Sequence, residues 1–286
     1  MTLKEYRSFF TESLLTIYPK TEIETFLYLL IEEYLGLNRI EFAIQPNYEI
    51  KEEKIQLLNK GLERLKKEEP IQYIMGHTEF FGYSFIVNKN TLIPRPETEE
   101  LVAWVLNEIE KPTLHQRKIN YILDIGTGSG CIPISIAKEN KNTNLTAIDI
   151  SEEALKTAQK NAKKNKVTIQ FTKANILTEA KLDKQYDIII SNPPYVRNLE
   201  KKEIKNNVLL NEPHLALFVE NKNPLIFYDK IADLAKQYLT KKGKLFFEIN
   251  QYLGEETKQL LIRKGFNNIE LRKDIFKNDR MIKATL

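Results

Sequence analysis

Apolar and polar positions follow two different rhythms along this chain. From about residue 119 onward, short apolar runs are separated by segments with helical apolar spacing. The runs that predict strands are Tyr121–Ile125, Leu145–Asp149, Val167–Phe171, Asp187–Ser191, Lys244–Ile249, Ile269–Arg272 and Met281–Leu286. The segments that predict helices are Cys131–Lys138, Glu152–Asn165, Leu225–Tyr238 and Gly254–Arg263. This order predicts an α/β fold with a seven-stranded, mainly parallel sheet and helices on both faces. The last two strands are joined without a helix, so we expect an antiparallel hairpin at one edge.

Residues 1–70 show helical spacing only. Apolar positions 55, 58, 62 and 65, for example, line one face of a segment whose other face carries Lys and Glu. Pro19, Gly36 and Pro46 divide the region into several short helices. We expect a small all-helical domain that docks a macromolecular substrate. The plainer alternative is a bundle that only packs on the rest of the protein.

Residues 71–97, which join these two parts, are rich in aromatic residues and glycine and show alternating apolar and polar positions. Glu79–Val87 alternates around Gly82 and predicts a β-hairpin. Leu92–Glu99 contains two prolines around an arginine and leads into a helix that Thr98 is expected to cap. We therefore predict a helical domain at 1–70, a β-hairpin linker at 71–97 and the α/β domain at 98–286.

The composition favours a cytoplasmic protein with a packed core. Hydrophobic residues make up 42% and charged residues 29% of the chain, and no apolar run reaches the ~18–20 residues that a membrane span needs. No intrachain disulfide can form, because Cys131 is the single cysteine, and the first residues show no signal-peptide pattern. The cysteine and the three histidines lack metal-ligand spacing, so no metal site is expected.

Charge is unevenly distributed along the chain. The net charge is +4, but residues 1–70 carry 10 basic and 13 acidic residues, so the positive excess lies in the remainder. A mildly basic second part suits a substrate that is bound to RNA or the ribosome. It lacks a dense Lys/Arg stripe, so we expect no direct nucleic-acid binding.

The turn 191–195 (Ser-Asn-Pro-Pro-Tyr) directly follows the apolar run 188–190. Neither proline can continue the ladder of a strand, so Asn192 is expected in a stiff, extended turn at the carboxyl end of a buried strand. Ligands bind at that end in open α/β sheets. The Asn192 carbonyl and the Pro193 main-chain carbonyl are acceptors suited to an –NH2 group, and Tyr195 offers a flat face to cover a planar substrate. The alternative is a proline-stiffened loop with a capping asparagine.

The loop 126–130 (Gly-Thr-Gly-Ser-Gly) lies between a predicted strand and a predicted helix. A dinucleotide fingerprint would place its third glycine at Cys131, but the glycine comes one residue earlier. The tighter pattern is typical of enzymes that use S-adenosylmethionine. Asp149 ends the next strand, where an acid can bind both ribose hydroxyls. Asn175 and Ile176 follow the third strand, where the edge and face of an adenine would lie.

Four blocks of this sequence together resemble the release-factor glutamine methyltransferases (the HemK/PrmC type). They are 70–76 (Pro-Ile-Gln-Tyr-Ile-Met-Gly), 93–99 (Ile-Pro-Arg-Pro-Glu-Thr-Glu), 124–130 and 192–195, and 212–217 (Glu-Pro-His-Leu-Ala-Leu) resembles a further block. The resemblance covers nearly the whole chain. It implies a Rossmann-like S-adenosylmethionine-dependent methyltransferase domain that methylates the side-chain amide nitrogen (N5) of a glutamine. That glutamine lies in the Gly-Gly-Gln loop of class I peptide chain release factors.

The resemblance also implies roles for individual residues. The methionine part of S-adenosylmethionine, and later of the product S-adenosylhomocysteine, would lie against Gly126, Thr127, Gly128, Ser129 and Gly130. Asp149 would bind the ribose, and Asn175 and Ile176 would flank the adenine. Asn192 and the Pro193 carbonyl would hold the glutamine –NH2 group, with Pro194 beside them and Tyr195 covering it, so that Asn192, Pro193 and Tyr195 are the expected catalytic residues. Asn192 would also contact the cofactor, and Arg95 and Glu97 would shape the wall of the site.

Two positions depart from the family pattern. Residues 218–224 replace a glycine-rich turn, and Asn250 replaces a glycine.

Two other functions fit the motifs. One is methylation of an amino group of adenine or guanine in nucleic acid, against which the acidic N-terminal region counts. The other is a non-catalytic scaffold that binds S-adenosylmethionine, against which the intact glycine loop, Asp149 and Asn192 count.

Overall fold

The computed structural model describes residues 1–109, 119–178 and 181–286, which form two compact units. One unit is Met1–Gly76 together with Lys205–Asn211, and the other is His77–Ile204 together with Glu212–Leu286. No helix in the described ranges is both long and apolar enough to cross a membrane.

The first unit is all-helical, as the spacing predicts. Its helices are α1 (Leu3–Leu14), α2 (Lys20–Leu35), α3 (Arg39–Ile44), α4 (Glu52–Leu65), α5 (Ile71–Met75) and α9 (Asn206–Asn211). Gly36 ends α2 in the left-handed conformation that glycine adopts at little cost. Gly61 of α4 brings its backbone against Leu30 of α2, where an added Cβ would lie 3.1 Å from a Leu30 methyl carbon. The Arg64 guanidinium closes the unit by binding Glu69 and the main-chain carbonyls of residues 73 and 74.

The second unit is an α/β domain around a seven-stranded sheet. The strands follow the order β10-β11-β9-β6-β3-β4-β5 across the sheet. They are β3 (Asn120–Ile125), β4 (Thr143–Asp149), β5 (Gln170–Lys173), β6 (Tyr186–Ser191), β9 (Leu239–Glu248), β10 (Asn267–Lys273) and β11 (Asp279–Thr285). Pairing is parallel from β5 to β9, and β11 pairs antiparallel with both β9 and β10. The expected fold, with its antiparallel edge hairpin, is confirmed.

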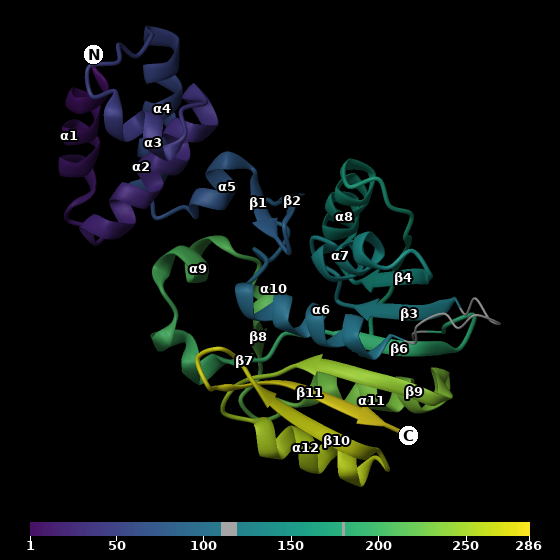
Figure 1. Cartoon of the computed structure of the whole chain (residues 1–286). Helices are drawn as coiled ribbons and strands as arrows, with labels where there is room; N and C mark the ends of the chain where they lie inside the picture. The colour runs from purple at the N-terminus through teal and green to yellow at the C-terminus, as the bar shows by residue number, and fades with distance from the viewer. Residues whose placement is uncertain (110–118, 179–180) are drawn as a thin grey trace. The chain divides into compact units, whose positions relative to one another are not determined.

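Helices cover both faces of this sheet (Figure 1). The helices are α6 (Pro96–Glu108), α7 (Cys131–Glu139), α8 (Glu152–Lys164), α11 (Ile226–Tyr238) and α12 (Gly254–Arg263). Successive residues of a strand point to opposite faces: Ile188 and Ile190 of β6 pack with α6 and α7, while Ile189 packs with α11. A continuous run of isoleucine therefore marks a strand that is buried on both sides.

Shorter elements complete the second unit. They are the hairpin β1 (His77–Phe80) and β2 (Tyr83–Ile86), the pair β7 (Val196–Arg197) and β8 (Phe218–Val219), the 3-10 helix η1 (Asn198–Glu203) and α10 (His214–Leu217). The hairpin has its turn at Gly82, as predicted. The sequence patterns missed β7, β8, η1, α9 and α10, because none is long enough to show a period.

Two local expectations are wrong. The third strand begins at Gln170 rather than Val167, because Val167 N donates to Ala162 O and Lys166 adopts a positive φ of 57°, which together close the end of α8. Thr98 does not cap α6. The helix begins at Pro96 after Arg95, and Thr98 is a buried residue inside its first turn.

Candidate functional site

The neighbouring strands β6, β3 and β4 end next to one another at the carboxyl-terminal end of the parallel strands, beside the glycine loop. Gly126, Gly128 and Gly130 have φ values of 76°, 56° and 80°. Side chains are strained in this left-handed region, which is why glycine recurs there. The Ile148 carbonyl accepts from the amides of residues 126 and 127, so the loop is fixed to β4. A Cβ at Gly126 would lie 4.0 Å from the Asn192 main-chain oxygen, so the loop also lies close to the end of β6.

Asp149 ends β4 and joins this loop to the next helix. Its Oδ2 accepts from Gly128 N at 2.8 Å and its Oδ1 accepts from Ser151 N at 2.8 Å. Burial raises the pKa of the Asp149 carboxyl, and these amides oppose that rise by favouring the charged form. The carboxylate is thereby held in place at the surface of a cavity.

A second acid, Asp124, lies beneath the loop and is fully buried. Neither carboxylate oxygen forms a hydrogen bond of ordinary geometry among the described residues, although the Thr127 hydroxyl is near enough to lower the pKa of this carboxyl. Burial raises the pKa of Asp124 to about 7, and the nearby charge of Asp149 adds to the rise. Buried acceptors of this kind are costly unless something pairs with them. A cationic group at the loop would supply that partner.

The cavity at this edge encloses about 310 Å³, which is in the lower range for small-molecule sites. The predicted site residues that line it are Gly126, Gly128, Asp149, Asn175, Ile176, Asn192, Pro193 and Pro194. The predicted site residues that do not line it are Thr127, Ser129, Gly130, Tyr195, Arg95 and Glu97. Apolar side chains from outside the predicted set, including Leu92, Leu215 and Phe227, complete the wall. Within the described ranges no cluster of three or more metal-ligating side chains is found.

Asn192 faces this cavity and is connected behind it to a buried acid. Its Nδ2 donates to Thr98 Oγ1 at 3.3 Å, and the Thr98 hydroxyl donates to Glu248 Oε2 at 2.6 Å. The Tyr195 hydroxyl donates to the other oxygen, Glu248 Oε1, at 3.0 Å. Burial and the charge of Glu248 raise the pKa of Tyr195, so its hydroxyl remains a donor. Tyr195 is therefore bound through its hydroxyl behind Asn192.

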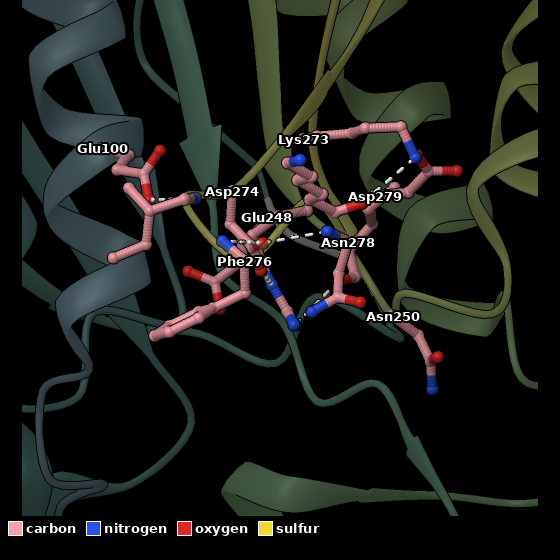
Figure 2. Close-up of polar contacts among 12 residues, drawn as sticks. Glu100, Glu248, Asn250, Lys273, Asp274, Phe276, Asn278 and Asp279 are labelled. Carbon is pink, nitrogen blue, oxygen red and sulfur yellow. Dashed lines mark hydrogen bonds and ion pairs between the residues drawn. The ribbon is translucent and has the colours of Figure 1, made fainter.

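Arg280 extends the same network to the turn between β10 and β11. Its Nε donates to Asp274 Oδ2 at 3.1 Å, and its Nη1 lies 3.5 Å from the Tyr195 hydroxyl. Figure 2 shows Asp274, whose other oxygen accepts from the amides of Phe276 and Asn278. The turn is thereby fixed next to the buried end of β9.

Arg95 binds another block of the sequence. Its Nη2 lies 2.6 Å from Glu212 Oε1, and the other carboxylate oxygen accepts from Ile93 N at 3.1 Å. The side chain of Glu212 is 1% exposed and that of Arg95 is 32% exposed, so the carboxylate is buried while the guanidinium still reaches water. It joins two of the blocks on which the family resemblance rests. Glu97, in the first turn of α6, is half-buried.

The sequence did not identify Thr98, Glu248 and Arg280 as residues of this network. A signal existed for Glu248, which is a charged residue inside the apolar run 245–249 at the carboxyl end of a strand. Charged residues are rarely buried unless they are paired, so an acid in such a run indicates a buried network. No comparable signal marks Thr98 or Arg280, because their contacts join residues far apart in the sequence.

Comparisons with known proteins agree with this geometry. Residues 106–217 match the model of the methyltransferase small domain family, and residues 4–76 match that of the PrmC N-terminal domain. Among solved structures, the hMettl16 catalytic domain in complex with a 3′UTR hairpin superimposes with a TM-score of 0.60 at 18% identity, over 91% of this chain and 90% of that one. The fold and the site together define a Rossmann-like methyltransferase.

Curated relatives narrow the class to one family. The release factor glutamine methyltransferase of Flavobacterium psychrophilum is 54% identical over 99% of both chains. The enzyme of the same name from Bacteroides thetaiotaomicron is 40% identical over 97% of this chain and 98% of its own length. This chain belongs to the release factor glutamine methyltransferase family.

Proposed function

We propose that this protein transfers a methyl group from S-adenosylmethionine to the side-chain amide nitrogen of a glutamine in peptide chain release factors. The observation that carries the proposal is the position of Asn192. It lines the same cavity as the glycine loop and Asp149, at the end of the adjacent strand. A nitrogen bound at Asn192 would therefore lie in the same cavity as a ligand bound at the loop.

The residues present fit S-adenosylmethionine. Asp149 is fixed at the cavity wall, where its carboxylate can accept from ribose hydroxyls. Asn175 and Ile176 line the neighbouring wall and suit an adenine edge and face. The Asp124 carboxylate beneath the loop does not line the cavity, but its negative charge favours a positive charge at the loop, such as the ammonium of the methionine part. When bound, this cofactor supplies an electrophilic methyl group on a sulfonium.

The acceptors at the end of β6 suit the nitrogen that receives the methyl group. An amide nitrogen is a poor nucleophile because its lone pair is delocalised into the carbonyl. Two acceptors, Asn192 Oδ1 and the Pro193 carbonyl, can bind the two N–H groups of the glutamine and direct the lone pair towards the cavity. Orientation and exclusion of water would supply most of the rate. As the new N–C bond forms, the methyl–sulfur bond of the donor breaks and its electron pair stays on sulfur, which leaves a neutral thioether. The methylated amide nitrogen is then cationic and strongly acidic, and it gives its extra proton to water after the transfer.

The substrate we propose is the glutamine of the Gly-Gly-Gln loop in class I release factors, and the helical unit is proposed to dock the rest of the factor. The relatives' name specifies a release factor glutamine, which supports the first part of this proposal. For the second part, α3 has no buried residue, and its Ile40 and Ile44 are 72% and 69% exposed. We also propose a cytoplasmic location, where release factors act.

The two alternative functions are less well supported. Curated relatives that cover nearly the whole chain carry the name of a glutamine methyltransferase, and likeness to an RNA-bound methyltransferase at 18% identity concerns the fold. A non-catalytic scaffold has no need of an asparagine and prolines placed in the cofactor cavity.

Incubation with S-adenosylmethionine labelled on its methyl group separates the three functions. We expect label in a class I release factor and none in RNA or DNA. Label in nucleic acid would support the first alternative, and no transfer to any substrate would support the scaffold.

A further inference from the structure

Glu248 is an unusual group to find behind the cavity. It ends β9 and is 1% exposed, so it must be paired to remain charged. Both of its oxygens accept hydroxyl protons, one from Thr98 and one from Tyr195. Burial raises the pKa of Glu248, and the hydroxyl donors and the positive charge of Arg280 oppose that rise by stabilising the carboxylate. An ionised carboxylate can only accept hydrogen bonds.

With Glu248 ionised, this restriction fixes the direction of each hydrogen bond in the chain Glu248–Thr98–Asn192. The Thr98 hydroxyl has a single proton, and it donates this proton in a hydrogen bond to the Glu248 carboxylate at 2.6 Å. Thr98 Oγ1 can then only accept from its other neighbour, Asn192. The Asn192 side chain must therefore direct its –NH2 group, and not its carbonyl, towards Thr98.

The orientation of Asn192 decides what the cavity offers to a substrate. A carboxamide is planar, with its oxygen and nitrogen on opposite sides of one carbon. With Nδ2 bound to Thr98 inside the protein, Oδ1 is left on the cavity side. A rotated carboxamide would present N–H donors to the N–H donors of an incoming amide, and neither could bind the other.

We propose that Thr98 and Glu248 are positioning residues that keep the Asn192 carbonyl oxygen available to the nitrogen of the substrate. This inference rests on the proposed function, since it concerns the acceptor for that nitrogen. Both residues act through Asn192 and neither lines the cavity. Tyr195 supports the arrangement by donating to the other oxygen of Glu248, and Arg280 Nη1 lies 3.5 Å from the Tyr195 hydroxyl.

The test is Thr98→Val, which keeps the size of the side chain and removes the hydroxyl. We expect kcat with a release factor to fall about tenfold, because Asn192 is free to rotate once its partner is lost. KM for the release factor and the Kd of S-adenosylmethionine should stay within about twofold, since the cavity wall is unchanged. Turnover is calculated per cofactor-binding site measured by calorimetry, so a partly unfolded sample does not affect the result.

Three matched variants complete the experiment. Thr98→Ser retains the hydroxyl and should restore kcat. Glu248→Gln should lower kcat to a similar extent as Thr98→Val. A glutamine –NH2 group can donate to Thr98, which would then be free to donate to Asn192 and so reverse both hydrogen bonds. Thr257→Val is the control, since Thr257 is also buried and its hydroxyl donates to the Leu253 carbonyl of its own helix at 2.7 Å, so kcat should not change.

Full kcat in Thr98→Val, or a loss that Thr98→Ser fails to restore, would overturn the inference. Both outcomes leave the proposed function intact, provided that the wild-type protein methylates the release factor. Absence of transfer by the wild-type protein would contradict the proposed function itself.

Discussion

The Asn250 side chain forms hydrogen bonds with three neighbouring residues after the end of β9. Its Nδ2 donates to the Tyr195 carbonyl and to Glu200 Oε2, both at 2.9 Å, and its Oδ1 accepts from Tyr252 N at 2.9 Å. The resemblance to the family leads one to expect glycine at this position. Here the carboxamide fastens the end of β9 to the segment that follows Asn192.

Replacement of Asn250 by glycine should therefore be costly. We expect Asn250→Gly to lower the free energy of unfolding by about 1–3 kcal/mol, because three hydrogen bonds at a buried position are lost. Urea denaturation measures the change. The matched control is Asn268→Gly at a position with a φ of 47°, where glycine is favoured and the loss should be less than about 0.5 kcal/mol. Equal losses in both variants would contradict this role.

The residues of the site differ in how far the sequence alone identifies them. Gly126, Gly128, Asp149 and Asn192 occupy turns directly after strands, so their approach to one cavity follows from topology. Arg95 was expected to shape the wall of the site, but its charge is paired with Glu212, 117 residues away. Such a pairing is decided by the folded backbone and leaves no periodic signal in the sequence.

At the scale of elements, one ion-pair cluster fastens α6 to the sheet. Glu108, the last residue of α6, lies 2.8 Å from Lys244 of β9 and 2.8 Å from Lys283 of β11. Hydrogen bonds from Lys244 and Lys283 lower the pKa of Glu108 to about 2. Since α6 also carries Thr98, this cluster helps to hold the helix whose threonine bonds Asn192.

The cluster predicts a dependence of stability on pH. A carboxyl with a lowered pKa in the folded state stabilises the protein above its ordinary pKa of 4.5, and this contribution is lost as the pH falls towards about 2. We expect Glu108→Gln to lower the free energy of unfolding at pH 7 by on the order of 1 kcal/mol, allowing for solvent screening. At pH 3 the wild type and the variant should differ less. Urea denaturation at both values tests this, and an equal difference at both would contradict it.

The boundaries of helices and strands were predictable where the spacing of apolar residues ends at a glycine or a proline. The apolar runs of β3, β6 and β11 mark buried strands, and the Gly130 position marks the start of α7. The start of β5 was placed wrongly because Val167 is apolar and β-branched but serves to close α8. Local composition cannot distinguish an apolar cap from an apolar strand.

At the scale of the whole molecule, the two units are joined by more than one stretch of chain. Lys205–Asn211 belongs to the helical unit although the residues before and after it belong to the α/β unit. Within the helical unit, Asn211 Nδ2 donates to the Glu68 carbonyl at 3.0 Å. This assignment could not be predicted, because a single short helix distant in sequence carries no sign of the unit it joins.

The proposed docking role of the helical unit can be tested on its exposed helix α3. We expect the double variant Ile40→Ser and Ile44→Ser to raise KM for a release factor about fivefold or more, because exposed apolar anchors are lost from the interface. The melting temperature and kcat should not change, since neither side chain is buried. Ile262→Ser, at a 48% exposed position of α12 in the other unit, is the control. An unchanged KM in the double variant would contradict docking at α3.

The most direct test of the whole account is to map the methyl group on a release factor after reaction with the wild-type protein and with Asn192→Ala. Peptide mass spectrometry should find one added methyl group on the glutamine of the Gly-Gly-Gln loop with the wild-type protein. The variant should bind S-adenosylmethionine and lose most of the transfer. A methyl group on another residue, or full transfer by Asn192→Ala, would contradict the account.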